Sequence, residues 1–205
     1  MLLKSGLNLL SKRPVPSFLS DFYVSGAERN YILNYYYRNS SSSPIIINLS
    51  HEFIEWFRGF TDAEGCFLIV KTGNTFTFRF IIKLHVDDVN LLNFIRNSLG
   101  DIGNVTTEGS VANYKVSSQK EIKLIIEIFT KYYLNSSKHL DFLAFRRAYE
   151  LYTSSNSKTP ELAKEINMLK DSMNKKRTNF DREKSHKIYI TENWLLGFVE
   201  GDVEF

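Results

Sequence analysis

Apolar residues recur at helical spacing in residues 50–64 of the chain. Phe53, Phe57 and Phe60 fall on one face of a helix there. Ser50 suits the N-cap position, because its hydroxyl can accept a hydrogen bond from a backbone N–H of the first turn. The helix is expected to end in the sequence Asp-Ala-Glu-Gly, directly before an extended run. Two carboxylates therefore stand where a helix passes into a strand.

The two runs that follow alternate between apolar and polar positions. Residues 66–72 and 75–85 are typical of strands, and Gly73-Asn74 between them signals a turn. One face of the second strand is entirely apolar and consists of Phe76, Phe78, Phe80, Ile82 and Leu84. The other face carries Thr75, Thr77, Arg79, Ile81 and Lys83. The apolar face is expected to cover a core, and the polar, basic face is expected to stay open.

Further elements follow as far as residue 132. The pattern predicts a helix over 86–99, strands over 104–108 and 112–117, and a helix over 119–132. The element order α-β-β-α-β-β-α predicts an α+β saddle, a four-stranded antiparallel sheet with helices on one face. A polar segment comes next, in which Thr159-Pro160 begins another helix.

The first helix has a second copy near the end of the sequence. A shift of 138 positions superposes the chain's two tryptophans and several neighbours, as the following pairs show: Trp56 and Trp194, Gly59 and Gly197, Phe60 and Phe198, Asp62 and Glu200, Ala63 and Gly201, Glu64 and Asp202. An internal duplication explains this agreement better than chance. The small residues Gly59, Ala63, Gly197 and Gly201 form stripes that would let the two helices pack closely.

Close packing would bring two carboxylates together. Glu64 and Asp202 would then stand side by side at helix C-termini, where they repel each other and face the negative end of the helix dipole. A divalent cation would compensate for this, and oxygen ligands favour Mg²⁺ with water and phosphate completing its shell. The alternative is a helix pair whose terminal acids only face solvent.

Composition narrows the classes of protein. Lys+Arg 26 against Asp+Glu 23 leave a charge of +3, which permits a nucleic-acid partner without requiring one. The single cysteine excludes an internal disulfide framework and a cysteine-rich zinc fold. The chain has no apolar run of the roughly 18 residues that a membrane span needs, so no membrane partner is expected. The four histidines have no metal-ligand spacing.

The two copies resemble a known family. FRGFTDAEG and LLGFVEGDV are similar to the signature helices of the LAGLIDADG homing endonucleases and maturases, and the resemblance spans roughly residues 49–205. KLHVDDVNLLNFIRNSLG and KYYLNSSKHLDFLAFRRAYELY between them match as well. The likeness is greatest to two-motif proteins of fungal mitochondrial introns. The resemblance implies a mitochondrial, site-specific endonuclease that cuts double-stranded DNA and so spreads its own intron. It also implies that Glu64 and Asp202 hold the Mg²⁺ needed for cleavage.

The resemblance also implies further site residues. The open face of the sheet would enter the major groove of DNA, through Leu68, Val70, Thr72, Thr77, Arg79, Lys83, Asn113, Lys115 and Ser117. The alternative is an ordinary solvated face. Lys138 lies in a stretch whose lysine is near the scissile phosphate in the family, so it is the candidate electrostatic stabiliser. Tyr133 departs from the family here, which usually has proline at that position.

The domain division follows from these elements. We expect an N-terminal extension over 1–44, a first LAGLIDADG domain over 45–152, a basic linker with a short helix over 153–188, and the second motif helix over 189–205 without a sheet of its own.

Two departures from the family support the alternative of an inactive remnant. Val203 stands where the family has glycine, and the second half is expected to be truncated after its helix. A separate alternative, from a different class, is a maturase that binds intron RNA to assist splicing. A homodimer that pairs two first-motif helices would restore two sites.

Overall fold

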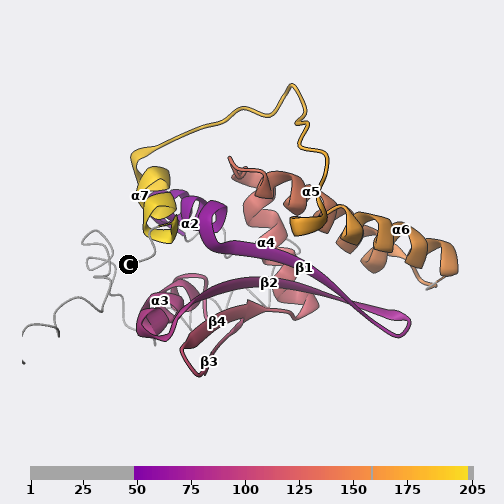
Figure 1. Ribbon diagram of the computed structural model, residues 1–205, viewed down its shortest axis with the longest axis horizontal. Helices are drawn as coiled ribbons and strands as arrows, with labels where there is room; N and C mark the ends of the chain where they lie inside the picture. The colour runs from indigo at the N-terminus through magenta and orange to yellow at the C-terminus, as the bar shows by residue number, and fades with distance from the viewer. Residues whose placement is uncertain (1–48, 158, 203–205) are drawn as a thin grey trace, which may run out of the picture.

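The computed structural model describes residues 49–157 and 159–202. Its elements are, in order, α2 (His51–Glu64), β1 (Gly65–Thr72), β2 (Thr75–His85), η3 (Val86–Asp88), α3 (Val89–Ser98), β3 (Asn104–Glu108), β4 (Val111–Val116), α4 (Gln119–Lys131), α5 (Lys138–Ser154), α6 (Pro160–Asp171), η4 (Asn174–Lys176) and α7 (Glu192–Asp202). Figure 1 shows their arrangement. The expected N-terminal extension over 1–44 and Val203 lie outside the described residues.

The strands form one antiparallel sheet in the order β1-β2-β4-β3. In β2 every second residue is buried, and Phe80 pairs with Phe67 of β1 on one side and with Val116 of β4 on the other. The predicted saddle with four antiparallel strands is thereby confirmed. Helices α2 and α5 lie above β1 and β2 in Figure 1, and α4 crosses behind these strands. The apolar residues of the sheet form one core with residues of these helices.

Aromatic rings fill the centre of the core. Phe67 of β1 is 1% exposed, and its ring centroid lies 5.4 Å from that of Phe80, 5.5 Å from that of Phe142 and 5.4 Å from that of Phe145. Rings at this spacing attract one another through their edges and faces as well as through the area they bury. The sheet and α5 are therefore joined by direct aromatic contact.

One helix of this core was not predicted. The sequence pattern assigned no element to the residues of α5, which runs for 17 residues over Lys138–Ser154. Its buried residues Phe142, Phe145 and Tyr149 have helical spacing, but the pattern is weak because Leu140 and Leu151 place apolar side chains on the opposite face. The boundaries of the other elements differ from the predicted ones by a few residues at most. The helix predicted over 86–99 is divided into η3 and α3.

A side chain of the linker covers the free edge of β1. The Asn174 side-chain amide donates to the Phe67 carbonyl at 2.9 Å, and its backbone N–H donates to Asp141 at 3.0 Å. Arg177 also bonds this carboxylate, with Nε 2.8 Å from Asp141 Oδ1. Unpaired strand edges are prone to non-native pairing, so these bonds protect the edge and attach the linker to the domain.

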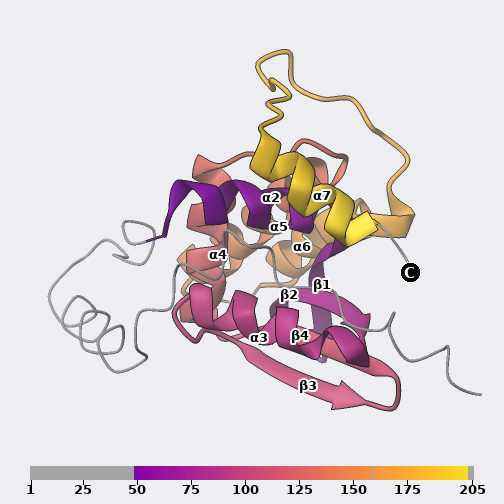
Figure 2. The same ribbon diagram turned by 90° about the vertical axis from the view of Figure 1, so that its left-hand side faces the viewer.

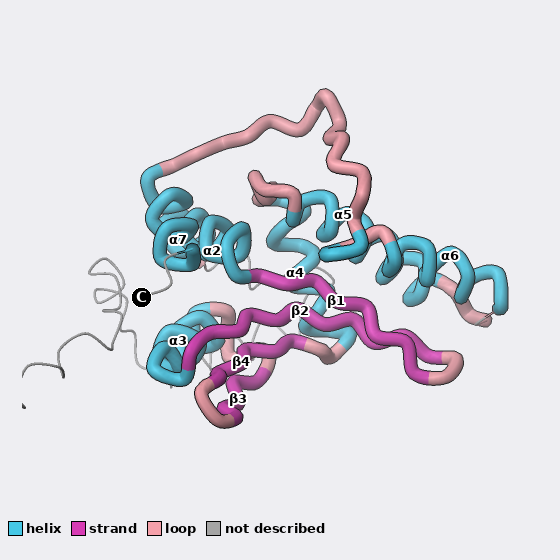
Figure 3. Tube along the Cα trace, viewed as in Figure 1, coloured by secondary structure: helices cyan, strands magenta, loops and turns pink. Residues whose placement is uncertain are grey.

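The linker then runs as a long loop to α7 (Figure 3). Near the end of this long loop, Tyr189 bonds the buried side chain of Asn135. The Asn135 amide donates to the Tyr189 carbonyl at 2.7 Å, and the Tyr189 N–H donates to the Asn135 side-chain oxygen at 3.0 Å. Arg58 of α2 donates to the same carbonyl at 2.6 Å. The rings of His139 and His186 stack with centroids 4.1 Å apart. These contacts attach the end of the linker to the domain just before α7.

Acid should weaken this attachment. Burial, followed by the nearby His186 and Arg182, lowers the pKa of His139 from 6.5 to about 4, against the opposing effects of Asp62 and Glu183. The folded protein therefore keeps His139 neutral, whereas the unfolded chain binds a proton below pH 6.5. Because the unfolded state binds more protons in this window, the free energy of unfolding should fall as the pH drops from 6.5 to about 4. Urea unfolding at several pH values measures it.

A substitution separates this effect from general acid denaturation. His139→Phe keeps a ring to stack on His186 and removes the titrating group, so it should make the pH dependence in this window shallower. His51→Gln changes an exposed histidine at the start of α2 and should leave the dependence as it is. An unchanged slope for His139→Phe would contradict the assignment.

Candidate active site

Helices α2 and α7 pack side by side (Figure 2), and at their glycines no room is left for a side chain. A Cβ added to Gly59 would overlap the carbonyl oxygen of Trp194, and one added to Gly197 would overlap that of Trp56. A Cβ on Gly201 would come within 2.5 Å of the Cβ of Ala63. Gly59 and Gly197 thus each lie against the tryptophan backbone of the other copy, as an internal two-fold relation requires.

The two tryptophans also bond across the helix pair. Trp56 Nε1 donates to Glu200 Oε2 at 2.8 Å, and Trp194 Nε1 donates to Asp62 Oδ2 at 2.9 Å. Both indole donors need a partner, since Trp56 is 0% and Trp194 7% exposed. The two bonds are equivalent under the shift of 138 positions that relates the copies.

Asp62 has two more partners and is buried. Its carboxylate accepts from the backbone N–H groups of Asn135 and Ser136, each at 2.8 Å. These two residues belong to the loop just before α5. Asp62 therefore joins three parts of the fold, namely α2, α7 and this loop, and a carboxylate satisfied in this way is stable without a cation.

Glu64 and Asp202 are the last residues of α2 and α7. Glu64 is half-buried and Asp202 is exposed. A Cβ on Gly201, the residue before Asp202, would lie 3.4 Å from Glu64 Cγ. The two helix ends therefore converge, and both carboxylates stand where the helix dipoles are negative. This concentration of negative charge favours a cation.

Lys138 comes to the same helix end. Its ammonium donates to the carbonyl of Ala63, next to Glu64. Burial lowers the pKa of Lys138, while Glu64 and Asp62 favour its charged form. The loop that Asp62 holds leads directly into Lys138, which begins α5. The predicted catalytic lysine thus lies beside Glu64, bonded to the end of its helix.

The donor set fits a hard divalent cation that also takes ligands from outside the protein. Carboxylates and helix-end carbonyls are oxygen donors, the type that Mg²⁺ prefers. Among the described residues no group of three or more His, Cys, Asp or Glu could enclose a metal. Mg²⁺ commonly binds through one or two carboxylates together with water and substrate phosphate, so the two acids suffice for such a site.

The open face of the sheet begins at Glu64, because β1 follows it directly. The structure places the predicted DNA-contacting residues of the strands opposite the core, in register across neighbouring strands: Leu68 pairs with Arg79, Val70 with Thr77, and Lys83 with Asn113, while Thr72 and Lys115 continue the rows. Ser117 falls just past the end of β4. These side chains form one continuous surface.

Strand β3 adds residues that the sequence analysis missed. Asn104 pairs with Lys115 and Thr106 pairs with Asn113, so both share the open face. Val105 between them packs against the core. Val105 is the single apolar residue of this five-residue strand, and it was the only local signal of which face of β3 is open. The pairing of β3 with β4 is what assigns Asn104 and Thr106 to the open face.

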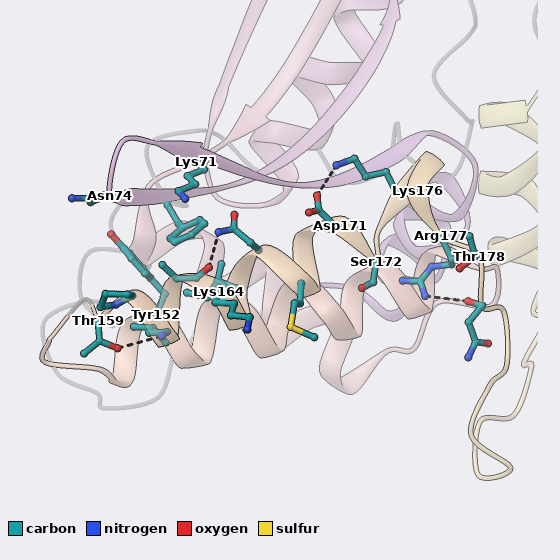
Figure 4. A pocket seen from close by; sticks show the side chains of 18 residues that line it. Lys71, Asn74, Tyr152, Thr159, Lys164, Asp171, Ser172, Lys176, Arg177 and Thr178 are labelled. Carbon is teal, nitrogen blue, oxygen red and sulfur yellow. Dashed lines mark hydrogen bonds and ion pairs between the residues drawn. The ribbon is translucent and has the colours of Figure 1, made fainter.

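A cavity of about 850 Å³ lies elsewhere, between the β1–β2 hairpin and α6 (Figure 4). Lys71 of the hairpin and Lys164 of α6 line it. Lys176, also in its wall, pairs with Asp171 at 2.5 Å. None of the three predicted catalytic residues lines this cavity, so the candidate site remains the junction of α2 and α7.

Comparison with known proteins agrees with this geometry. A model of the LAGLIDADG endonuclease family matches residues 57–149. The chain is 32% identical over 176 residues to the probable intron-encoded endonuclease Cox1-I1b of Schizosaccharomyces pombe, across 81% of this chain and 43% of that protein. The chain belongs to the LAGLIDADG family.

Solved LAGLIDADG structures share the fold. Meganuclease I-SmaMI bound to uncleaveable DNA matches 74% of this chain and 59% of its own, with 26% identity and a TM-score of 0.66. The homing endonuclease I-GzeII in complex with its DNA target matches 72% of this chain and 58% of its own, with 31% identity and a TM-score of 0.58. I-SmaMI is also known bound to uncleaved DNA in the presence of calcium ions, with 25% identity and a TM-score of 0.63.

The LAGLIDADG relatives are longer than this chain. It spans 43% of the length of Cox1-I1b and 59% of the I-SmaMI chain. No helix among the described residues is long and apolar enough to cross a membrane.

A methyl group at the helix contact should separate the LAGLIDADG helices. In Gly197→Ala the added carbon meets the backbone of Trp56 and Phe60, which cannot move without shifting α2. We expect the free energy of unfolding to fall by about 1–3 kcal/mol or more, as measured by urea denaturation.

The control lies on the same helix. Leu195 is 50% exposed on the outer side of α7, so Leu195→Ala should change the free energy of unfolding by no more than about 0.5 kcal/mol. Equal losses for the two variants would show that α7 is not held by its glycines.

Proposed function

We propose that this chain is part of an intron-encoded, site-specific endonuclease that cuts both strands of double-stranded DNA and so promotes homing of its intron. The observation that carries the proposal is the convergence of Glu64 and Asp202 at two equivalent helix ends. A polar, partly basic sheet face begins at the first of them. Relatives named as intron-encoded endonucleases and meganucleases bound to DNA support it.

The residues divide into two tasks. On the sheet, Arg79, Lys83 and Lys115 supply positive charge among neutral polar side chains, which suits contacts with phosphates and base edges in the major groove. This surface would orient the duplex with a phosphate of each strand near one carboxylate.

At the junction, Glu64 and Asp202 would hold the divalent cation against these phosphates. When bound, Mg²⁺ would supply an activated water and stabilise the leaving oxygen. The relative I-SmaMI bound to uncleaved DNA in the presence of calcium ions supports a divalent cation at such a site. The ammonium of Lys138, beside Glu64, adds positive charge where negative charge develops on the phosphate.

The other functions considered have less support. Nothing in the described residues favours an RNA maturase over the endonuclease. We do not propose a dimer of two first-motif helices, because α7 already occupies the glycine face of α2. Placement in mitochondria is proposed from the resemblance to proteins of fungal mitochondrial introns.

Removing one charge should separate binding from cleavage. Glu64→Gln keeps the size of the side chain and removes a cation ligand, so strand cleavage should fall at least ~100-fold while DNA binding persists. Cleavage of DNA that carries the intronless insertion site, together with a gel-shift measurement of binding, tests this.

A matched substitution controls for charge alone. Glu192 is an exposed acid in the first turn of α7, and Glu192→Gln should cut as the unaltered protein does. Undiminished cutting by Glu64→Gln would refute the assignment of the metal site.

A basic residue on the sheet should govern DNA affinity. Lys83 is exposed on the open face, so Lys83→Ala should weaken binding to all duplexes and reduce the salt dependence of binding by about one unit of slope. Lys164→Ala on α6, an exposed lysine on the helical side, should leave both unchanged. Equal effects of the two would contradict the role of the open face.

A further inference from the structure

We infer that the two crossed tryptophan–carboxylate bonds set the register of α2 against α7 and thereby position Glu64 and Asp202 for metal binding. Trp56 donates to Glu200 and Trp194 donates to Asp62, at 2.8 and 2.9 Å. The inference rests on the proposed function, because it assigns a purpose to the acids of each motif that are not the proposed cation ligands. The four residues are positioning residues.

Glycine contacts let the helices approach closely, because a Cβ at Gly59 or Gly197 would overlap the backbone of the other helix. Van der Waals contact of this kind depends less on direction than a hydrogen bond does. A hydrogen bond to a carboxylate is directional and short. Sliding one helix by one residue moves it about 1.5 Å along its axis. Because the two indole bonds are equivalent across parallel helices, such a slide would stretch one of them and compress the other. The crossed pair therefore selects one axial position.

This position reaches the site over a short distance. Asp62 stands two residues before Glu64 on α2, and Glu200 stands two residues before Asp202 on α7. Each indole thus binds the helix turn that carries a proposed ligand on the opposite helix. A change in register would move one carboxylate relative to the other.

Asp62 extends the same control to the lysine. The carboxylate that accepts from Trp194 also accepts from the N–H groups of Asn135 and Ser136 at 2.8 Å. That loop leads to Lys138, whose ammonium bonds Ala63. The buried side chain of Asp62 therefore helps to position the carboxylates of Glu64 and Asp202 and the ammonium of Lys138.

Glu200 is the better of the two acids to substitute. Both carboxylate oxygens of Asp62 accept hydrogen bonds from backbone N–H groups. In Asp62→Asn the side-chain NH₂ would therefore face a backbone N–H donor. Glu200 is half-buried and takes its indole bond on Oε2. Glu200→Gln can keep an oxygen for Trp56, whereas Glu200→Met has similar length but no such acceptor and leaves the buried indole N–H unsatisfied.

The probe is Tb³⁺, which takes oxygen ligands as Ca²⁺ does and whose luminescence is excited by energy transfer from nearby tryptophan. Both tryptophans lie at the helix pair, and the chain has only these two. Luminescence is titrated with Tb³⁺ for the unaltered chain, Glu200→Gln and Glu200→Met, and Ca²⁺ competition checks the site. We expect the midpoint of Glu200→Gln to stay within ~2-fold and that of Glu200→Met to rise ~10-fold or more, as outer-shell losses at metal sites do.

Two results would overturn the inference. If Glu200→Met binds Tb³⁺ as the unaltered chain does, the bond does not position the ligands. If Glu200→Gln is weakened as much as Glu200→Met, the charge of Glu200 matters instead of its hydrogen bond, and Glu200 acts as a ligand.

An independent measurement keeps the register distinct from the proposed function. Trp56→Phe, Glu200→Met and the double variant are unfolded in urea and followed by circular dichroism. If the bond holds the helices, the double variant should lose no more in unfolding midpoint than the worse single variant, whereas additive losses would overturn the inference. Absence of any Tb³⁺ response in the unaltered chain would contradict the proposed metal site, and this cycle would still decide the register.

Discussion

The contact between α2 and α7 depends on the absence of side chains at Gly59 and Gly197. Each of these residues lies against the backbone of the tryptophan in the other copy, and this closeness brings the indoles within reach of Asp62 and Glu200. Wider separation would leave two large aromatic donors and two carboxylates without these partners. Backbone contact and crossed hydrogen bonds therefore depend on each other.

The helix ends gain their chemical character from the same contact. A carboxylate at the C-terminus of a single exposed helix is only slightly unfavourable. Two such ends converge here, with Glu64 half-buried beside Gly201 and with the ammonium of Lys138 on the neighbouring carbonyl. Charge is thus concentrated where the open face of the sheet begins. One acid of each motif supports the structure, and the other is left for the proposed cation.

Much of the fold followed from periodicity, because the relevant forces act between near neighbours. The alternation of Phe76, Phe78 and Phe80 indicated which face of β2 is buried, and Ser50 marked the start of α2, as the structure confirms. Helix α5 was missed because its apolar residues lie on more than one face and blur the periodicity. The role of Asp62 could not be found locally, since its backbone donors lie 73 and 74 residues away. The same holds for Asn174 at the edge of β1, whose partner Phe67 is distant in sequence.

The sequence by itself determined the strands and most of the helices, the two faces of the sheet, and the duplication that pairs Glu64 with Asp202. These depend on spacing along the chain, which packing does not alter. Only the tertiary structure decided which acids bond tryptophan, that Lys138 bonds the end of α2, and how β3 extends the open face. Those outcomes depend on hydrogen-bond geometry between segments far apart in sequence, and that geometry exists only once the helices and sheet have packed.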